Sequence, residues 1–544
     1  MPGQPDVLII GSGIGGGTLA SRLVQHGLHV TILERGGFLP QEAENWNVDA
    51  VFGEQRYVPT ETWWDKHGNA FRPGTYYYVG GSSKMFGAVM IRFREADFKE
   101  LIHEDGISPE WPIKYPDLEP YYALAEKMYC VHGTAGVDPT DPPGVPPYPF
   151  PALPNEPVIQ GVHEALKAAG IASSPLPVAV QRDGTGNCIR CMTCDGFPCK
   201  VHAKTDAEVA AVRPALATGR LTLITDAKVT RLNLFEDGAK VESVVYETKG
   251  DSQTISAPVI VLSASAVNSA VLLLNSACPQ APDGVANSSG VVGRNYMAHN
   301  NTALMCVGMK RNPTKFQKTI CINDFYFGDA EFKFPMGNVQ GLGKLQEEML
   351  TLKVKAMPGF IARFLAERSV DWWVMSEDLP DPENRVLVRD GQIHLIYKNN
   401  NLRAHRRLVK HTIKLMRRLG FGLNLPYYMT GLSVSHQCGT VRFGNDPKTA
   451  ALDPFCRAFD HKNLFVVDAS FFPSSAAVNP ALTIAAQALR VADHIATVDF
   501  AGRSAISSNQ SLDTLSPITA RPTELVTLSS RIPVERTPIS TLSR

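Results

Sequence analysis

The stretch that decides the fold is VLIIGSGIGGGTLASRLVQHGLHVTILER, residues 7–35. Residues 6–10 form an apolar run that predicts a short strand, and residues 15–26 carry apolar side chains at helical spacing. Residues 28–33 predict a second strand that ends at Glu34. Strand, glycine-rich turn, helix and strand make one βαβ unit. The sequence therefore predicts an α/β fold built on a parallel sheet.

The turn in this unit, GSGIGG, fits the pattern G-x-G-x-x-G between a strand and a helix. Gly11 permits the tight turn, Gly13 lets the backbone approach a pyrophosphate, and Gly16 lets the helix pack closely on the strand. The helix N–H groups from Ile14 onward face the phosphates, and Glu34 can accept hydrogen bonds from ribose hydroxyls. The unit predicts a bound dinucleotide but does not separate NAD from FAD, and a glycine corner without ligand is the alternative interpretation.

The composition points to a large globular protein that acts on a small molecule. The chain has 544 residues, of which 44% are hydrophobic and 19% charged, which allows more than one core. Lys and Arg number 53 and so do Asp and Glu, so no net charge favours nucleic acid or an anionic membrane. We expect no membrane span and a cytoplasmic location, because neither a signal region nor an apolar span of about 18 residues is found.

Further segments alternate between strand-like and helical patterns. Strands are expected over 221–232, 241–247 and 257–263, and helices over 266–275 and 402–419. The helix over 402–419 should end at Gly420, and its basic face is expected to be exposed to solvent. The proline-rich residues 137–154 should form an extended surface loop. The Ser/Thr/Pro-rich sequence from residue 499 onward suggests a disordered tail.

Five pieces of the chain, in this order, resemble the glucose–methanol–choline (GMC) family of flavin-dependent oxidoreductases. They are the N-terminal glycine turn, YVGGSSKMFG (78–87), WPIKYPDLEPYY (111–122), VGRNYMAHN (292–300) and a terminal block with GLSVSHQCGTVRFG (431–444) and NLFVVDASFFPSSAAVNPALTIAAQALRVADHI (463–495). The resemblance covers the chain to about residue 497. It implies non-covalent FAD in a discontinuous Rossmann-like domain, and a substrate domain built on an antiparallel sheet with helices.

The resemblance also divides the chain and assigns cofactor contacts. The expected FAD-binding domain comprises residues 1–130, 200–297 and 432–500, interrupted by a proline- and cysteine-rich excursion (131–199) and a substrate domain (298–431), with a tail at 501–544. The expected FAD contacts are Gly11, Gly13, Ile14, Gly16, Glu34, Arg35, Gly80, Gly81, Ser82, Ser83, Gly87, Val229, Asp468, Ala469, Asn479, Pro480 and Thr483.

Two residues of the terminal block are expected to carry the chemistry. Asn479 precedes Pro480 and a long apolar-periodic helix, so the residues alone predict Pro480 at the first helical position and Asn479 as its cap. The resemblance places His436 and Asn479 together at the flavin. Imidazole can remove a hydroxyl proton near neutral pH while a hydride leaves the carbon, so His436 is the expected base and Asn479 the group that orients the alcohol.

Two positions depart from the family pattern. Some family members attach the flavin covalently to a histidine in the flavin loop, whereas the corresponding residue here is Lys84, so no covalent link is expected. Residues 263–266 read Ser-Ala-Ser-Ala where the family often has glycine after the alanine. This substitution puts a close backbone approach at Ser265 in doubt.

Four cysteines crowd into a short segment as C-x2-C-x2-C-x4-C: Cys188, Cys191, Cys194 and Cys199. This spacing is near the one that supplies thiolates to iron–sulfur clusters, and four thiolates can also bind zinc. The fourth spacing departs from the ferredoxin pattern, which favours free thiols or a local disulfide. All three interpretations stay open at this point.

The substrate is expected to be a secondary alcohol of a sugar or glycoside. Candidate pocket residues are aromatic and lie between VGRN and His436: Phe325 and Tyr326 next to Asp324 and Phe327, and Trp372 next to Trp373. A sterol or long-chain alcohol is an alternative substrate, because the family's cholesterol oxidases share the His and Asn pair. A lyase that holds FAD without redox chemistry and an NAD-dependent dehydrogenase are alternatives of other classes. The sequence does not show whether oxygen, a quinone or a redox protein accepts the electrons. It also leaves the oligomeric state open.

Overall fold

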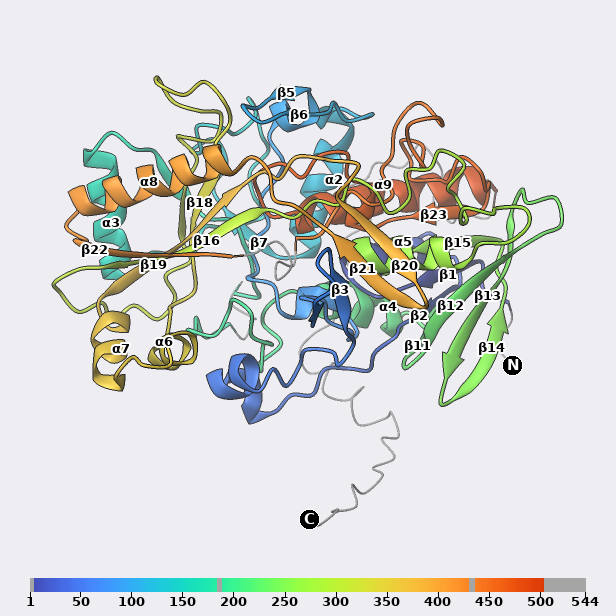
Figure 1. Cartoon of the computed structure of the whole chain (residues 1–544), viewed down its shortest axis with the longest axis horizontal. Coiled ribbons are helices and arrows are strands. Elements are labelled where there is room, and N and C mark those ends of the chain that lie inside the picture. Colours follow the sequence, from blue (N-terminus) through green and yellow to red (C-terminus); the bar gives the residue numbers. More distant parts are fainter. Residues whose placement is uncertain (1–3, 183–187, 430–435, 503–544) are drawn as a thin grey trace, which may run out of the picture.

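The computed structural model describes residues 4–182, 188–429 and 436–502. A five-stranded parallel sheet and a six-stranded antiparallel sheet form the two halves of the molecule (Figure 1). The combination of a Rossmann-like half with an antiparallel half confirms the predicted α/β class. The predicted tail from residue 503 onward lies outside the described residues.

The parallel sheet has the strand order β11-β2-β1-β15-β23. Its central strand β1 pairs with β2 on one side and with β15 on the other, with Val7 opposite Val30 and Val259. The central three strands are buried throughout and apolar except for Thr31, which is typical of a parallel sheet covered on both faces. The strands are β1 (Val7–Ile10), β2 (Val30–Leu33), β11 (Leu221–Ile224), β15 (Val259–Leu262) and β23 (Leu464–Val466).

Three segments far apart in the sequence meet over this sheet. Helix α1 (Ile14–Gln25) packs against α9 (Ala481–His494), and α9 also packs against α2 (Tyr115–Met128). The buried face of α9 carries Leu482, Ala485, Ala486 and Leu489, whose small and apolar side chains allow close helix contact. The last part of the described chain is thereby brought onto the first βαβ unit.

The six-stranded sheet has the order β22-β16-β19-β18-β17-β9, and every pair in it is antiparallel. Helix α8 (Leu402–Arg418) lies across β16, β19 and β22 and buries its apolar face, including Leu408 and Met416. The predicted helix over 402–419 is therefore confirmed, and Gly420 follows it at φ +92°. The strands are β9 (Ser173–Pro175), β16 (Asn300–Val307), β17 (Ile320–Ile322), β18 (Asn338–Gly341), β19 (Ser369–Ser376) and β22 (Leu423–Tyr428).

Four smaller sheets accompany these two in the described residues. The predicted strand over 221–232 is in fact two strands, because β11 belongs to the parallel sheet and β12 to a separate meander. The remaining strands are β3 (Trp63–Asp65), β4 (Ala70–Phe71), β5 (Leu101–Ile102), β6 (Ile107–Ser108), β7 (Val131–Gly133), β8 (Phe150–Pro151), β10 (Val178–Ala179), β12 (Lys228–Leu234), β13 (Val241–Thr248), β14 (Asp251–Ile255), β20 (Arg385–Arg389) and β21 (Gln392–Ile396). The remaining helices are α3 (Pro157–Ala168), α4 (Arg213–Ala217), α5 (Ala266–Asn275), α6 (Glu347–Lys353) and α7 (Gly359–Ala366).

The domain boundaries drawn from the sequence stay a prediction. Strand β9 comes from the expected excursion 131–199 and forms an edge of the six-stranded sheet. Strands β20 and β21, from the expected substrate domain, share a sheet with β3 and β4. None of the helices in the described ranges is long and apolar enough to cross a membrane.

Candidate functional site

A cavity of about 420 Å³ opens at the carboxyl ends of the parallel strands. This is the edge at which α/β sheets bind ligands, because loops and helix N-termini converge there. Twelve of the residues expected to contact the cofactor line it: Gly11, Gly13, Ile14, Glu34, Arg35, Gly81, Ser82, Ser83, Val229, Asp468, Ala469 and Pro480. The tertiary structure therefore gathers residues from both ends of the chain around one space.

The glycine turn leaves backbone donors facing this cavity. Gly11 has φ +99°, a conformation that glycine adopts without strain. Helix α1 begins at Ile14, its N-cap Gly13 supplies no side-chain acceptor, and its first turn contains no acidic residue. Its first N–H groups therefore lack a capping side chain among the described residues and suit an anion such as a pyrophosphate. Gly16 does not line the cavity but packs α1 against Gly11 and Ser263, as the sequence predicts.

Glu34 is part of the turn itself. Its buried carboxylate accepts hydrogen bonds from Ser12 N at 2.9 Å, Ser12 Oγ at 2.6 Å and Gly36 N at 2.9 Å. Burial raises the pKa of Glu34, although these hydrogen bonds act in the opposite direction. Gly80 N–H donates to the same Ser12 hydroxyl at 3.0 Å, which ties the loop of residues 78–87 to the glycine turn. The expected contact of Glu34 with a ribose stays a prediction.

A planar wall closes another part of the cavity. The Arg35 guanidinium lies 3.9 Å from the centre of the Tyr77 ring. Its Nη2 donates to Glu61 Oε1 at 2.9 Å, and the Tyr77 hydroxyl donates to the other oxygen of Glu61. All three side chains line the cavity. A stacked guanidinium and a phenol ring present flat faces, which suit the flat ring of a nucleotide.

The loop around Gly81 holds Lys84 away from the cavity. Lys84 Nζ is buried and pairs with Asp206 Oδ2 at 2.9 Å and Glu208 Oε2 at 2.6 Å. Burial alone would lower the pKa of Lys84, but the two carboxylates raise it above its usual range. Lys84 is thus a charged residue with a structural role in this loop. Gly87 packs instead against the ion pair of Asp195 and Lys318 and does not line the cavity.

His436 is partly buried and pairs with a second, buried histidine, His299, which is not among the predicted site residues. His436 Nδ1 lies 2.9 Å from His299 Nδ1, and the two rings are nearly perpendicular at 86°. Burial and the neighbouring His299 lower the pKa of His436 to about 3, and burial lowers the pKa of His299 as well. Both imidazoles are therefore neutral near pH 7. In the sequence, His299 stands in the segment VGRNYMAHN (292–300), one of the five pieces that resemble the family, and this segment could have indicated it as a site residue.

Asn479 does not cap α9 as predicted. The helix begins at Ala481, and its first hydrogen bond runs from Ile484 N–H to the carbonyl of Pro480, which is therefore the N-cap. Asn479 Oδ1 is buried without a hydrogen-bond partner among the described residues, and so is Gln437 Nε2. Gln437 and Pro480 line the cavity, so the chain neighbours of His436 and Asn479 border the same space. Unpaired buried polar atoms at this place fit a bound cofactor and substrate that would complete them.

Three further expected contacts, Asn479, Gly80 and Thr483, are not among the residues that line the cavity in the described chain. Gly80 adopts φ +96° and thereby determines the path of the loop of residues 78–87, but it does not line the cavity. The hydroxyl of Thr483 lies 2.9 Å from that of Tyr122 and holds α9 against α2. Ser265, by contrast, lines the cavity and has φ 81° and ψ 159°, a conformation that glycine adopts far more easily. The backbone therefore keeps the glycine-like path that the sequence put in doubt.

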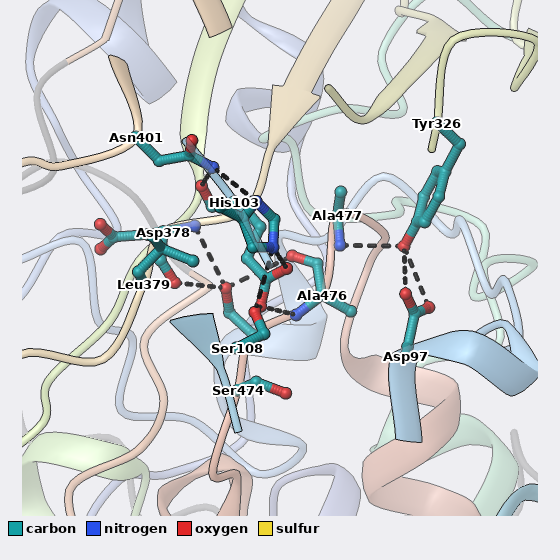
Figure 2. Close-up of polar contacts among 12 residues, drawn as sticks. Asp97, His103, Ser108, Tyr326, Asp378, Leu379, Asn401, Ser474, Ala476 and Ala477 are labelled. Carbon is teal, nitrogen blue, oxygen red and sulfur yellow. Dashed lines mark hydrogen bonds and ion pairs between the residues drawn. The ribbon is translucent and has the colours of Figure 1, made fainter. Parts of the chain in front are cut away.

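The three expected substrate residues are not in the cavity wall that the structure describes. Trp372 is fully buried in the core of the six-stranded sheet, where it packs with Leu304 and Leu408, because its strand β19 is central. Phe325 packs beside the same core and against His411. The buried Tyr326 hydroxyl donates to the Asp97 carboxylate and accepts from Ala477 N–H at 3.1 Å, as Figure 2 shows. Tyr326 thus holds the segment that leads to Asn479.

The four clustered cysteines face a second, small cavity of about 20 Å³. All ten cysteines of the chain are free, so the local disulfide that was considered is not formed. Within the described ranges no group of three or more His, Cys, Asp or Glu side chains has an arrangement that could hold a metal ion. Burial raises the pKa of the Cys194 thiol to about 12. These findings give no support to a cluster or a zinc ion at this position.

The comparisons with known proteins agree with this geometry. Models described as GMC oxidoreductase match residues 74–301 and 392–488, and a model of an NAD(P)-binding Rossmann-like domain matches residues 9–53. The chain is 30% identical to a 6'''-hydroxyparomomycin C oxidase of Streptomyces lividus, with 92% of this chain and 93% of the relative covered. It is 29% identical to a paromamine 6'-oxidase of Streptomyces fradiae, with 90% and 91% covered.

A third relative is the fructose dehydrogenase large subunit of Gluconobacter japonicus, 27% identical with 90% of this chain and 97% of the relative covered. Among solved structures, a pyridoxine 4-oxidase from "Mesorbium loti" superimposes with a TM-score of 0.64 at 18% identity, covering 90% of this chain and 99% of that one. At this identity the likeness concerns the fold alone. Taken with the glycine turn, the cavity and the histidine pair, these matches show that the chain is a member of the GMC oxidoreductase family, an FAD-dependent enzyme that oxidises alcohols.

Proposed function

We propose that this enzyme oxidises a hydroxyl group of a sugar or sugar-containing compound, with FAD held non-covalently in the cavity of about 420 Å³. The observation that carries the proposal is the neutral, partly buried imidazole of His436 together with the unpaired Oδ1 of Asn479. Neither residue lines the cavity itself, but their chain neighbours Gln437 and Pro480 do. A neutral imidazole can accept a proton, and an unpaired carboxamide can orient a hydroxyl.

When bound, FAD would supply the acceptor for a hydride. The N–H groups at the start of α1 would hold its phosphates, and Arg35 with Tyr77 would flank a flat ring. His436 would take the proton of the substrate hydroxyl as the hydride leaves the carbon, so that a carbonyl product forms and no charge is left on the substrate oxygen. Asn479 would hydrogen-bond that oxygen and keep the carbon oriented.

Two features support the substrate class and the mode of FAD binding. Three relatives over nearly the full chain are named for paromamine, hydroxyparomomycin and fructose, whereas cholesterol oxidases of Mycobacterium tuberculosis match only 58 residues. This favours a sugar over a sterol. Lys84 is committed to Asp206 and Glu208, which leaves it unavailable as an attachment point for the flavin.

Anaerobic mixing of the purified holoenzyme with a panel of alcohols tests the proposal. The panel contains paromamine, D-fructose, simple primary and secondary alcohols and cholesterol. We expect a sugar to bleach the flavin absorbance and precipitation in acid to release the flavin into the supernatant. Absence of bleaching by every compound would favour a lyase that holds FAD without using its redox chemistry, and bleaching by cholesterol alone would contradict the sugar proposal.

The same measurement separates catalytic from structural roles. His436→Ala should lower the rate of flavin reduction by about 10²–10⁴-fold, the usual worth of a positioned base, without changing the FAD content. The exposed His67→Ala is the matched control and should reduce at the normal rate. Subsequent mixing of the reduced enzyme with oxygen or a quinone identifies the electron acceptor.

A further inference from the structure

His299 is held so that only one of its nitrogens can carry the proton. The residue immediately precedes strand β16 and is buried. Its Nε2 lies 3.1 Å from the carbonyl oxygen of Ser475 and 3.0 Å from that of Ala476. A carbonyl oxygen only accepts hydrogen bonds, so Nε2 must be the donor and must carry the proton.

This assignment determines the state of the neighbouring ring. In a neutral imidazole one nitrogen donates and the other accepts, so His299 Nδ1 is an acceptor. The group that faces it at 2.9 Å is His436 Nδ1, which must therefore carry the proton of its own ring. The lone pair of His436 is then left on Nε2.

The two carbonyls reach one nitrogen because the backbone bends sharply between them. Ala476 has φ +53°, in the left-handed region that non-glycine residues seldom adopt. Ala476 N–H donates to Glu377 Oε1 at 3.2 Å, and Ser475 Oγ donates to the Asp378 carbonyl at 2.9 Å. Ala477 N–H donates to the Tyr326 hydroxyl, and Figure 2 shows these contacts around Ala476 and Ala477. The segment is thus fixed on both sides of the bend.

We propose that His299 is a positioning residue that sets the tautomer of His436, so that Nε2 of His436 is the nitrogen that accepts the hydroxyl proton of the substrate. The tautomer follows from the contacts of the folded chain, and only its use as a base rests on the proposed function. The charged group that acts on the pair is Glu377, whose carboxylate raises the pKa of His299 against the effect of burial and whose Oε2 lies 3.1 Å from His103 Nε2.

Neutron diffraction from a perdeuterated crystal of the enzyme at pH 7 tests the tautomer without any substrate. We expect deuterium on Nε2 of His299 and on Nδ1 of His436, and none on Nε2 of His436. Deuterium on Nδ1 of His299 would overturn the proposal. This measurement stays decisive even if no alcohol in the panel bleaches the flavin, in which case only the proposed function fails.

Two variants test the consequence for the reaction, with the panel compound that reduces the wild-type enzyme fastest. His299→Leu removes the hydrogen bonds to His436 and to the carbonyls of Ser475 and Ala476. It should lower the rate of flavin reduction by about 10²-fold, since displacing a reacting group costs about that much. The acidic limb of its rate profile should shift from that of wild type, because His436 Nδ1–H loses its hydrogen-bond acceptor.

His299→Gln keeps a donor toward the carbonyls and an acceptor toward His436, and should retain the rate to within about tenfold of wild type. FAD content and melting temperature, measured for both variants, show whether the fold is intact. If the leucine variant keeps the wild-type rate and pH profile, or if both variants lose activity equally with an unchanged pH profile, His299 is a packing residue and the proposal is wrong.

Discussion

The substitution Gly13→Ala separates cofactor binding from folding. Gly13 has φ −65° and ψ −167°, which is extended backbone that alanine adopts freely. A Cβ atom at this position would meet none of the described atoms within 4 Å, and Gly13 lines the cavity. The apoprotein should therefore lose at most about 1 kcal/mol, the difference between glycine and alanine at an N-cap.

The methyl group would instead occupy space that a phosphate needs in order to reach the N–H groups of α1. Losing one charge-assisted hydrogen bond costs about 1.5–3 kcal/mol, which corresponds to FAD binding that is about ten to 150 times weaker. The matched variant is Gly16→Ala, whose Cβ would overlap the Gly11 carbonyl and lie 3.0 Å from Ile9 Cγ2. That variant should destabilise the apoprotein by about 1–3 kcal/mol through overpacking.

Thermal unfolding of the apoproteins and titration with FAD, followed by flavin fluorescence, measure both effects. We expect Gly13→Ala to melt close to wild type and to bind FAD weakly, and Gly16→Ala to melt at a lower temperature. Wild-type FAD affinity in Gly13→Ala would refute the assignment of the turn as the phosphate site. A loss of apoprotein stability in Gly13→Ala as large as in Gly16→Ala would refute the inference that a Cβ atom at position 13 meets no neighbouring atoms.

Three other substitutions test the structure. Ser265→Gly should raise the unfolding free energy by about 1 kcal/mol, because it relieves a glycine-like conformation; a drop in the melting temperature would contradict this. Burial lowers the pKa of His405 to about 4, so stability is full above the unfolded pKa of about 6.5 and falls as pH drops toward 4, by up to about 1.4 kcal/mol per pH unit. His405→Gln removes this titrating group, so the unfolding free energy should fall less steeply as the pH drops, by the uptake of up to one proton on unfolding. An unchanged slope would contradict the buried neutral state of His405. Glu126→Gln should cost about 3–5 kcal/mol in denaturant unfolding, because it leaves the buried Arg92 unpaired, and a change below 1 kcal/mol would contradict this.

Much of the local structure follows from short-range patterns. The predicted helix over 266–275 coincides with α5, and the βαβ unit around Gly11 has its boundaries within two residues of those expected. Such elements depend on periodicity and on glycine conformations that are encoded within a few residues. The strand predicted over 221–232 was divided in two because the pattern carries no information about which sheet each part joins.

The substrate candidates show where reasoning from residue type fails. Tyr326 and Trp372 have the aromatic character of a sugar site, yet one positions the segment before Asn479 and the other fills a core. An aromatic residue suits both a pocket and an apolar core, and only the position of its strand in the sheet decides between them.

The βαβ unit and the glycine turn can be predicted from short contiguous motifs, and the family from five such motifs in a fixed order; His436 and Asn479 are predicted as site residues from the last of these motifs. The pairing of His299 with His436, the two carbonyls at Ser475 and Ala476 that fix the proton on His299, and the binding of Lys84 by Asp206 and Glu208 emerge from the folded chain alone. The reason is physical: these contacts join residues up to 177 positions apart, and hydrogen bonds between such residues exist only after the chain has folded the terminal segment back onto the other sheets.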